Sequence, residues 1–248
     1  MTQKKTNPFQ YLQVKLPTWG LFLLGLLPII VQYAMDQQVI PTEYHVLILT
    51  IVLPLLQQIG KRIPQPELHE VQSFATITAG HSNTDPGAVN GKTKESDLVV
   101  NFRNAVAHYL REGGVHIKTD GVGTQNNPLS SAIKLINGSD VAVEFHMNAA
   151  ISKQANGVET IALPKDKKLA QDLSTAVATV LGSRLRGDKG WIDQSKSAHG
   201  RLAYVNAGGL IVELAFISND DELARFNARY WLAAKAVAKV LIKHLDEK

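Results

Sequence analysis

Two histidines of this sequence follow predicted strands, where they could bind a metal ion together. His81 begins a turn-rich loop after the predicted strand 74–79, and His146 ends the predicted strand 140–146. Ligands of open α/β sheets collect at the carboxyl ends of the strands, so the two imidazoles could converge on one point. Two simpler interpretations remain open: a surface turn capped by Asp85, and histidines whose roles are structural.

A single carboxylate, that of Glu213, interrupts the otherwise apolar predicted strand 210–216. Burying an unpaired carboxylate is strongly unfavourable, so this side chain must face a metal ion, a cationic partner or a wet cleft. A buried ion pair is the alternative interpretation.

Four short motifs follow one another along the chain. They are Gly80-His81 with Asp85 and Gly87-Ala88; Glu95, fourteen positions after His81; His146-Met147-Asn148-Ala149; and Val212-Glu213-Leu214-Ala215-Phe216-Ile217-Ser218-Asn219. In this order they resemble the motifs of the zinc-dependent N-acetylmuramoyl-L-alanine amidases of the Amidase_3 family, over about residues 74–245. The resemblance implies that His81, Glu95 and His146 bind zinc (Zn2+) and that Glu213 is the catalytic carboxylate.

The reaction that this resemblance implies is hydrolysis of the peptidoglycan amide bond between N-acetylmuramic acid and L-alanine. Two histidines and one glutamate form a typical catalytic zinc set with a fourth position open for water. Glu213 would take the proton of an activated water and return it to the leaving amine. Taken without the family pattern, Glu95 could merely begin a helix. The alternative function is a membrane-anchored wall-binding or scaffolding protein with an inactive amidase fold.

Two positions depart from the family pattern but leave the expected ligands intact. Glu144 stands where a small polar residue is expected, two positions before His146, and Ser82-Asn83 replace a more usual glycine pair. We expect these two departures to affect the conformation of the loops and the contacts with the substrate.

The composition narrows the chemistry and the partners. The 248 residues include no cysteine, which excludes disulfides, thiolate metal ligands and a cysteine nucleophile. Any metal ion must therefore be bound by histidine and carboxylate. The net charge of +4 and the pI near 9.2 suit an acidic partner. Together with the resemblance, this leads us to expect peptidoglycan as the substrate and no nucleic acid.

The pattern of short β-rich runs and helical periodicity predicts an α/β fold, with a mostly parallel sheet flanked by helices and preceded by an N-terminal transmembrane hairpin. The predicted strands are 74–79, 115–119, 140–146, 157–162 and 210–216, and the predicted helices are 95–112, 128–136, 165–181 and 228–244. The predicted domains are a membrane segment, 1–62, a linker with two prolines, 63–72, and the zinc amidase domain, 73–248.

Two apolar runs near the N-terminus predict membrane spans at about 16–35 and 39–59. Lys4, Lys5 and Lys15 precede the first run, and Lys61 and Arg62 follow the second, so both ends of the hairpin should lie in the cytoplasm. A cleaved signal peptide is the alternative for the first run, and an interfacial or buried helix at 46–56 is the alternative for the second.

This topology predicts a protein at the bacterial inner (cytoplasmic) membrane, with its catalytic domain in the cytoplasm until release. An enzyme held away from its wall substrate suggests phage-type lysis, in which an endolysin stays at the membrane until the membrane is permeabilised.

Overall fold

The computed structural model describes residues 29–55, 74–197 and 200–247. The chain divides into two compact units, Met1–Glu70 and Val71–Lys248. In the first unit a helix over 29–36 is followed by a turn and a 3-10 helix, Thr42–Tyr44. Helix α2 (His45–Leu47) and a π-helical segment, Ile48–Val52, continue from there.

The predicted transmembrane hairpin is corrected by this structure. Among the described residues, no helix is both long and apolar enough to cross a membrane. A spanning helix needs about 20 consecutive apolar residues, whereas the described helical stretches on either side of the turn cover only 29–36 and 42–55. The predicted spans extended over 16–28 and 56–59 as well, and these lie outside the described residues. The predicted location at the bacterial inner membrane depended on this hairpin and is corrected with it.

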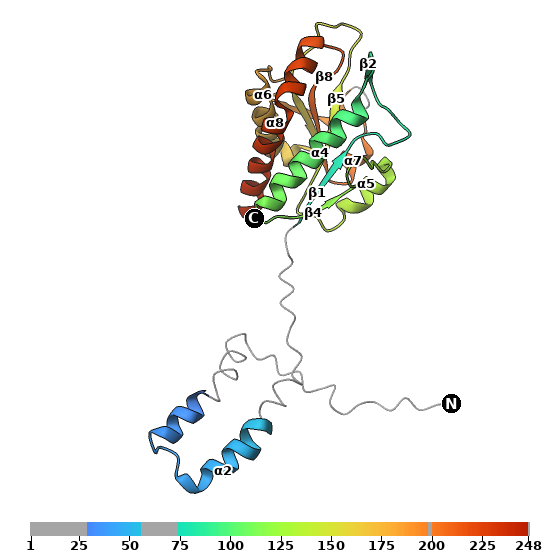
Figure 1. Cartoon of the computed structure of the whole chain (residues 1–248). Helices are drawn as coiled ribbons and strands as arrows, with labels where there is room; N and C mark the ends of the chain where they lie inside the picture. Colours follow the sequence, from blue (N-terminus) through green and yellow to red (C-terminus); the bar gives the residue numbers. More distant parts are fainter. Residues whose placement is uncertain (1–28, 56–73, 198–199, 248) are drawn as a thin grey trace, which may run out of the picture. The chain divides into compact units, whose positions relative to one another are not determined.

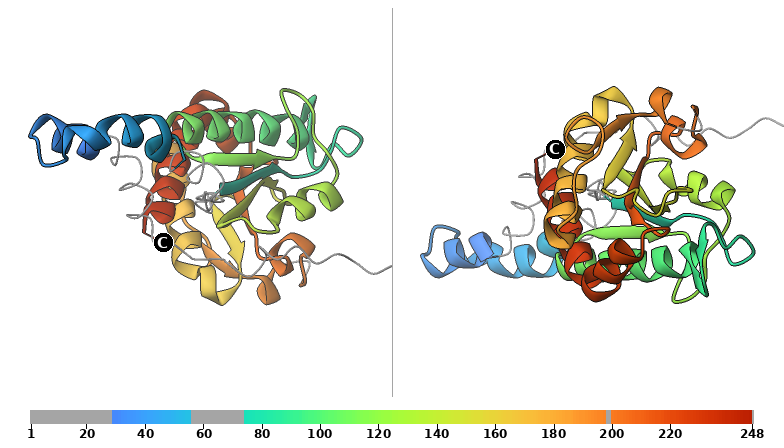
Figure 2. Two further views of the ribbon diagram at one scale, coloured as in Figure 1. Left: turned by 90° about the horizontal axis from the view of Figure 1, so that it is seen from below. Right: turned by 90° about the horizontal axis from the view of Figure 1, so that it is seen from above.

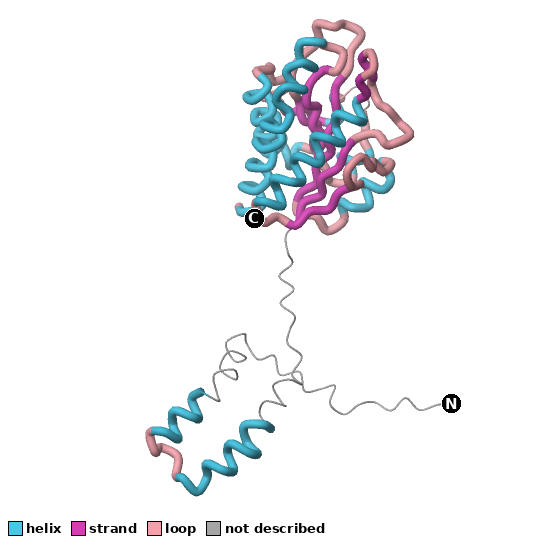
Figure 3. The backbone as a smooth tube through the Cα atoms, in the orientation of Figure 1, coloured by secondary structure: helices cyan, strands magenta, loops and turns pink. Residues whose placement is uncertain are grey.

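The second unit is built on a six-stranded sheet with the order β4-β1-β5-β8-β6-β7. Its neighbouring strands are parallel except for the pair of β6 with β8, which is antiparallel. The mostly parallel sheet flanked by helices was predicted from the sequence, and this part of the fold prediction is confirmed (Figure 3). The strands are β1 (Phe74–Ala79), β4 (His116–Thr119), β5 (Val141–Asn148), β6 (Glu159–Ala162), β7 (Trp191–Asp193) and β8 (Leu210–Phe216). A separate two-stranded hairpin pairs β2 (Val89–Asn90) with β3 (Thr93–Lys94).

The two faces of the sheet are covered unequally (Figures 1 and 2). Three long helices pack on one face: α4 (Glu95–Glu112), α6 (Lys167–Leu181) and α8 (Asp220–Asp246), with 18, 15 and 27 residues. Among the described residues, the α-helices on the other face are α5 (Leu129–Ile136) and α7 (Ala203–Asn206), with 8 and 4 residues. The short helices cannot cover the whole face, because a helix rises only about 1.5 Å per residue.

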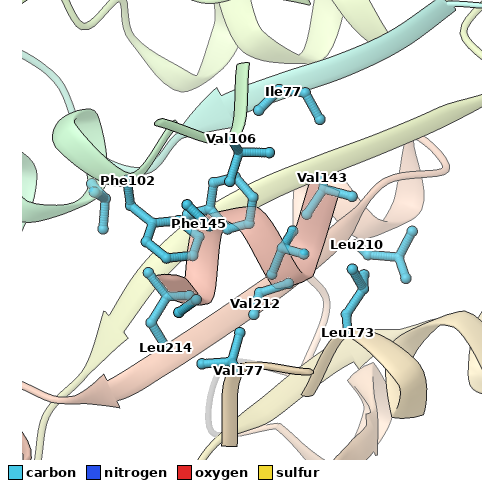
Figure 4. Close-up of a cluster of buried hydrophobic side chains, with 14 of the residues drawn as sticks. Ile77, Phe102, Val106, Val143, Phe145, Leu173, Val177, Leu210, Val212 and Leu214 are labelled. Atoms are coloured by element: carbon cyan, nitrogen blue, oxygen red, sulfur yellow. The ribbon is translucent and has the colours of Figure 1, made fainter. Parts of the chain in front are cut away.

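Alternation along the strands sends one set of side chains to each face. The main core lies between the sheet and the long helices. It contains the odd-numbered residues of β1 and β5 and the even-numbered residues of β8, for example Ile77, Val143 and Val212 (Figure 4). On the thinly covered face, a small cluster around Ala142, Ile211 and Tyr204 meets α5 and α7. Nearer the carboxyl ends of the same strands, this face carries polar side chains instead, namely Thr78, Glu144, His146 and Glu213. The candidate site therefore lies on the thinly covered face, where the side chains of His81 and His146 are 21% and 20% exposed.

A buried ion pair supports the strand that leads into the site. Arg103 Nη1 of α4 donates to Asp120 Oδ1 at 2.9 Å, and neither side chain is exposed to solvent. The Asp120 carboxylate also accepts a hydrogen bond from the backbone N–H of Ala79, the last residue of β1. Arg103 Nη2 donates to the carbonyl of Gln125 at 2.9 Å. This pair thus ties α4 to the end of β1 and to the loop after β4.

Arg103→Met should lower the free energy of unfolding by about 3–5 kcal/mol, because it leaves the Asp120 carboxylate buried and unpaired. Urea unfolding followed by the fluorescence of Trp191 and Trp231 measures the change. Adding Asp120→Asn to this variant should recover part of the loss, since the unpaired charge is then removed.

The matched control is Lys243→Met, which breaks an ion pair with Glu247 whose side chains are 77% and 65% exposed. We expect a change below about 0.5 kcal/mol there. Equal losses in the Arg103 and Lys243 variants would contradict the structural role of the buried pair.

Candidate functional site

His81, Glu95 and His146 form a cluster at the carboxyl edge of the sheet. Each offers one donor atom, and the three atoms all lie within 4.8 Å of one another. Glu95 Oε1 is the centre of the cluster, at 2.9 Å from His81 Nε2 and 3.1 Å from His146 Nδ1. In a tetrahedral site with metal–ligand bonds of about 2.0–2.1 Å, neighbouring donor atoms are about 3.3 Å apart. The cluster therefore fits one metal ion with two nitrogen ligands and one oxygen ligand.

His81 enters the cluster through an unusual backbone conformation. Directly after β1 it adopts φ = +67°, a left-handed conformation that residues with a side chain adopt at a cost of about 1–2 kcal/mol. This turn directs Nε2 to Glu95, while Nδ1 lies 3.0 Å from Asp85 Oδ2. The strain is thus used to place a ligand, as is common at functional sites.

Two glycines leave room for the ligands. A Cβ atom on Gly80 would lie 2.2 Å from Cε1 of His146, and one on Gly87 would lie 2.6 Å from Cδ2 of His81. Gly87 also has φ = +65°, which favours glycine independently. Both glycines of the sequence motif are therefore required by the packing of the imidazoles.

Glu95 is the first residue of α4 and is held there by backbone amides. Its Oε2 accepts a hydrogen bond from Ala88 N at 2.9 Å, and its Oε1 accepts one from Met147 N at 2.8 Å. Burial raises the pKa of this carboxyl, but the hydrogen bonds from His146 and His81 outweigh burial and hold the pKa well below its ordinary value. Glu95 therefore begins the helix and also stays ionised within the cluster.

Glu213 lies beside the cluster on β8, in register with His146 of β5. The register of the two strands shifts immediately after this pair, an irregularity that often adjoins active sites. Glu213 Oε2 is buried and has no hydrogen-bond partner among the described residues. Burial raises the pKa of Glu213 to about 7, although attraction to His146 opposes the rise. A carboxyl with this pKa can both accept and release a proton near neutral pH.

The structure thus brings together all four residues that the sequence motifs singled out. It also places three polar residues near them that the sequence analysis did not assign. Glu159 of β6 is in register with Glu213, and it accepts hydrogen bonds from Asn148 Nδ2 at 2.9 Å and from Arg186 Nε at 2.6 Å. The pairing of β6 with β8 brings Glu159 to this edge, and no local pattern in the sequence indicates that pairing.

Comparisons with known proteins agree with this geometry. The sequence profile of Amidase_3, described as N-acetylmuramoyl-L-alanine amidase, matches residues 76–243. A germination-specific N-acetylmuramoyl-L-alanine amidase of Bacillus subtilis (strain 168) is 26% identical over 195 residues, which are 69% of this chain and 79% of that protein.

Solved structures show the same fold. One from Neisseria meningitidis, described as an N-acetylmuramoyl-L-alanine amidase, is 48% identical, with a TM-score of 0.66 over 70% of this chain and 96% of that one. The N-acetylmuramoyl-L-alanine amidase of Clostridium difficile 630 is 20% identical, with a TM-score of 0.61 over 71% and 99% of the two chains. From the profile match, the identity to the Neisseria protein and the assembled cluster, we conclude that this chain belongs to the Amidase_3 family and is a peptidoglycan amidase.

Proposed function

We propose that this amidase binds zinc through His81, Glu95 and His146 and cleaves the bond between N-acetylmuramic acid and L-alanine with Glu213 as general base and acid. The observation that supports the metal assignment most directly is the convergence of two imidazole nitrogens on Glu95 Oε1. Imidazole nitrogens favour zinc over magnesium and calcium, which prefer oxygen ligands. Three protein ligands leave a position open, as in catalytic zinc sites.

In the proposed reaction, Glu213 handles the proton. Zinc, when bound, supplies a Lewis acid that polarises the scissile carbonyl and acidifies the attacking water. The ionised Glu213 carboxylate accepts a proton from that water as its oxygen adds to the carbonyl carbon. The same carboxyl then delivers the proton to the leaving nitrogen as the C–N bond breaks. The products are a muramyl lactyl carboxylate and a peptide with a free L-alanine amine.

We also propose that residues 73–248 are the catalytic domain, since they contain the four site residues and the sheet that positions them. The predicted linker 63–72 lies outside the described residues. The hypothesis of phage-type lysis assumed that the transmembrane hairpin holds the enzyme at the membrane until release. Because no described helix could cross a membrane, this hypothesis has lost its support. An inactive wall-binding protein is not favoured, because the cluster and Glu213 are all in place.

Glu213→Gln should lower kcat by about 10²–10⁴-fold, because the amide keeps the size of the side chain but cannot carry the proton. The rate at which purified peptidoglycan yields new L-alanine amino termini measures the loss. Zinc binding and the unfolding midpoint should be preserved, which separates catalysis from folding. Glu112→Gln, at an exposed position on α4, is the matched control and should stay within twofold of wild type. Comparable rates in both variants would exclude Glu213 as the general base.

Removal of the metal with a chelator should abolish release of L-alanine amino termini and lower Tm. Zinc should restore both, and magnesium should restore neither. A ligand that binds only the folded state stabilises it by about 4 kcal/mol at a thousandfold excess over Kd. His81→Ala should abolish the zinc-dependent rise in Tm. Undiminished activity in the chelated sample would show that the metal assignment is wrong.

A further inference from the structure

Glu144 is one of the two departures from the family pattern, and it contacts a proposed metal ligand. It stands two residues before His146 on β5, so both side chains lie on the thinly covered face of the sheet. Glu144 is 2% exposed, and its Oε1 lies 3.1 Å from His146 Nε2. The other ring nitrogen, Nδ1, lies 3.1 Å from Glu95 Oε1. The imidazole of His146 is therefore held between a carboxylate of the metal cluster and one outside it.

Glu144 can accept the proton that the ring keeps when a metal ion binds to the other nitrogen. A neutral imidazole has one N–H group and one nitrogen lone pair, and the hydrogen bond of one nitrogen decides the role of the other. Glu144, as a carboxylate, can only accept, so Nε2 of His146 donates to it. Nδ1 lies equally close to Glu95 Oε1, which is also a carboxylate oxygen, so the two contacts alone do not distinguish the nitrogens. A metal ion bound at Nδ1 would use the lone pair of that nitrogen and leave the one N–H of the ring on Nε2, where Glu144 accepts it.

A hydroxyl chain holds Glu144 in turn. Thr78 Oγ1 of β1 donates to Glu144 Oε2 at 3.3 Å, and the hydroxyls of Thr78 and Tyr204 are 2.9 Å apart. Burial raises the pKa of Tyr204 well above its ordinary value, so its hydroxyl keeps its proton. The hydroxyl proton of Thr78 is within reach of both Glu144 Oε2 and the hydroxyl oxygen of Tyr204. The chain thus runs from α7 through β1 to the ring of His146.

The imidazole of His81 also contacts a carboxylate outside the cluster, but this carboxylate is exposed to solvent. Asp85 lies 3.0 Å from His81 Nδ1, but its side chain is 62% exposed, whereas that of Glu144 is 3% exposed. Water weakens the electrostatic interaction of the exposed carboxylate with its imidazole, whereas the interaction of the buried carboxylate is screened much less. The buried pair should therefore influence its metal ligand more strongly than the exposed pair does.

We propose that Glu144 is a positioning residue, which orients His146 with Nδ1 toward the metal ion and increases the basicity of that nitrogen. This inference rests on the proposed metal site. It assigns a function to the position where this chain departs from the family pattern. Carboxylates that accept from metal-bound histidines commonly act in this way, and their loss lowers metal affinity about 10–100-fold.

The first test measures zinc affinity of the metal-free full-length chain, by competition with a chromophoric chelator. Glu144→Gln should weaken binding by about 10–100-fold. Thr78→Val, which removes one hydrogen bond to Glu144, should weaken it by about 2–10-fold. The matched control is Glu159→Gln, since Glu159 is also a buried carboxylate on this face but contacts Arg186 and Asn148 instead of a histidine. Its zinc affinity should stay near that of wild type.

Urea unfolding of the metal-free variants distinguishes positioning from a merely structural role. If Glu144→Gln unfolds more easily but binds zinc as tightly as wild type, the proposal is overturned. If wild type itself binds no zinc, the proposed metal site fails, which is a separate result from equal affinity in wild type and variant.

The second test needs no variant. Nitrogen-15 NMR of histidine-labelled, zinc-loaded wild type should show His146 with a protonated Nε2 and a metal-bound Nδ1. The opposite assignment, with zinc on Nε2, would refute the proposed role of Glu144 even if the variants did not fold.

Discussion

The carboxylate of Glu95 is buried, and burial of a charge is tolerated only when the charge is surrounded by partners. Backbone amides of Ala88 and Met147 and the rings of His81 and His146 supply these partners. They come from the loop after β1 and the end of β5, so a carboxylate at the start of α4 draws three separate segments together. A metal ion placed among the same atoms would extend this network with a further positive charge.

Unequal cover of the sheet leaves the imidazoles of this cluster partly exposed. The long helices α4, α6 and α8 bury one face completely, and that face supplies the apolar core. The short helices α5 and α7 leave the carboxyl ends of β5 and β8 without apolar cover on the other face. Carboxylates at these positions, Glu144 and Glu213, are therefore compatible with the fold. The same residues in the main core would be strongly destabilising.

Local signals in the sequence predicted much of the fold, and their failures have identifiable causes. Helix α4 has the predicted bounds, because a run of helix formers follows two acidic residues in its first turn. Helix α8 begins at Asp220 instead of near residue 228, since Asn219 caps it and Glu222 accepts hydrogen bonds from the backbone amides of Gly157 and Phe216. The predicted transmembrane hairpin is wrong because hydropathy records apolar runs but not how far a helix continues, and the described helical stretches, 29–36 and 42–55, are each shorter than a membrane span requires.

The candidate site residues could be named from the sequence, because the type, order and spacing of His81, Glu95, His146 and Glu213 are local properties that a motif records. Their geometry required the folded chain. Glu213 stands beside His146 only because β8 pairs with β5, and Glu144 reaches the opposite side of the same ring only because the strand directs both side chains to one face. Strand pairing and burial are set by contacts between residues far apart in the sequence. They decide which nitrogen faces the metal position and which carboxylate is left without a hydrogen-bond partner.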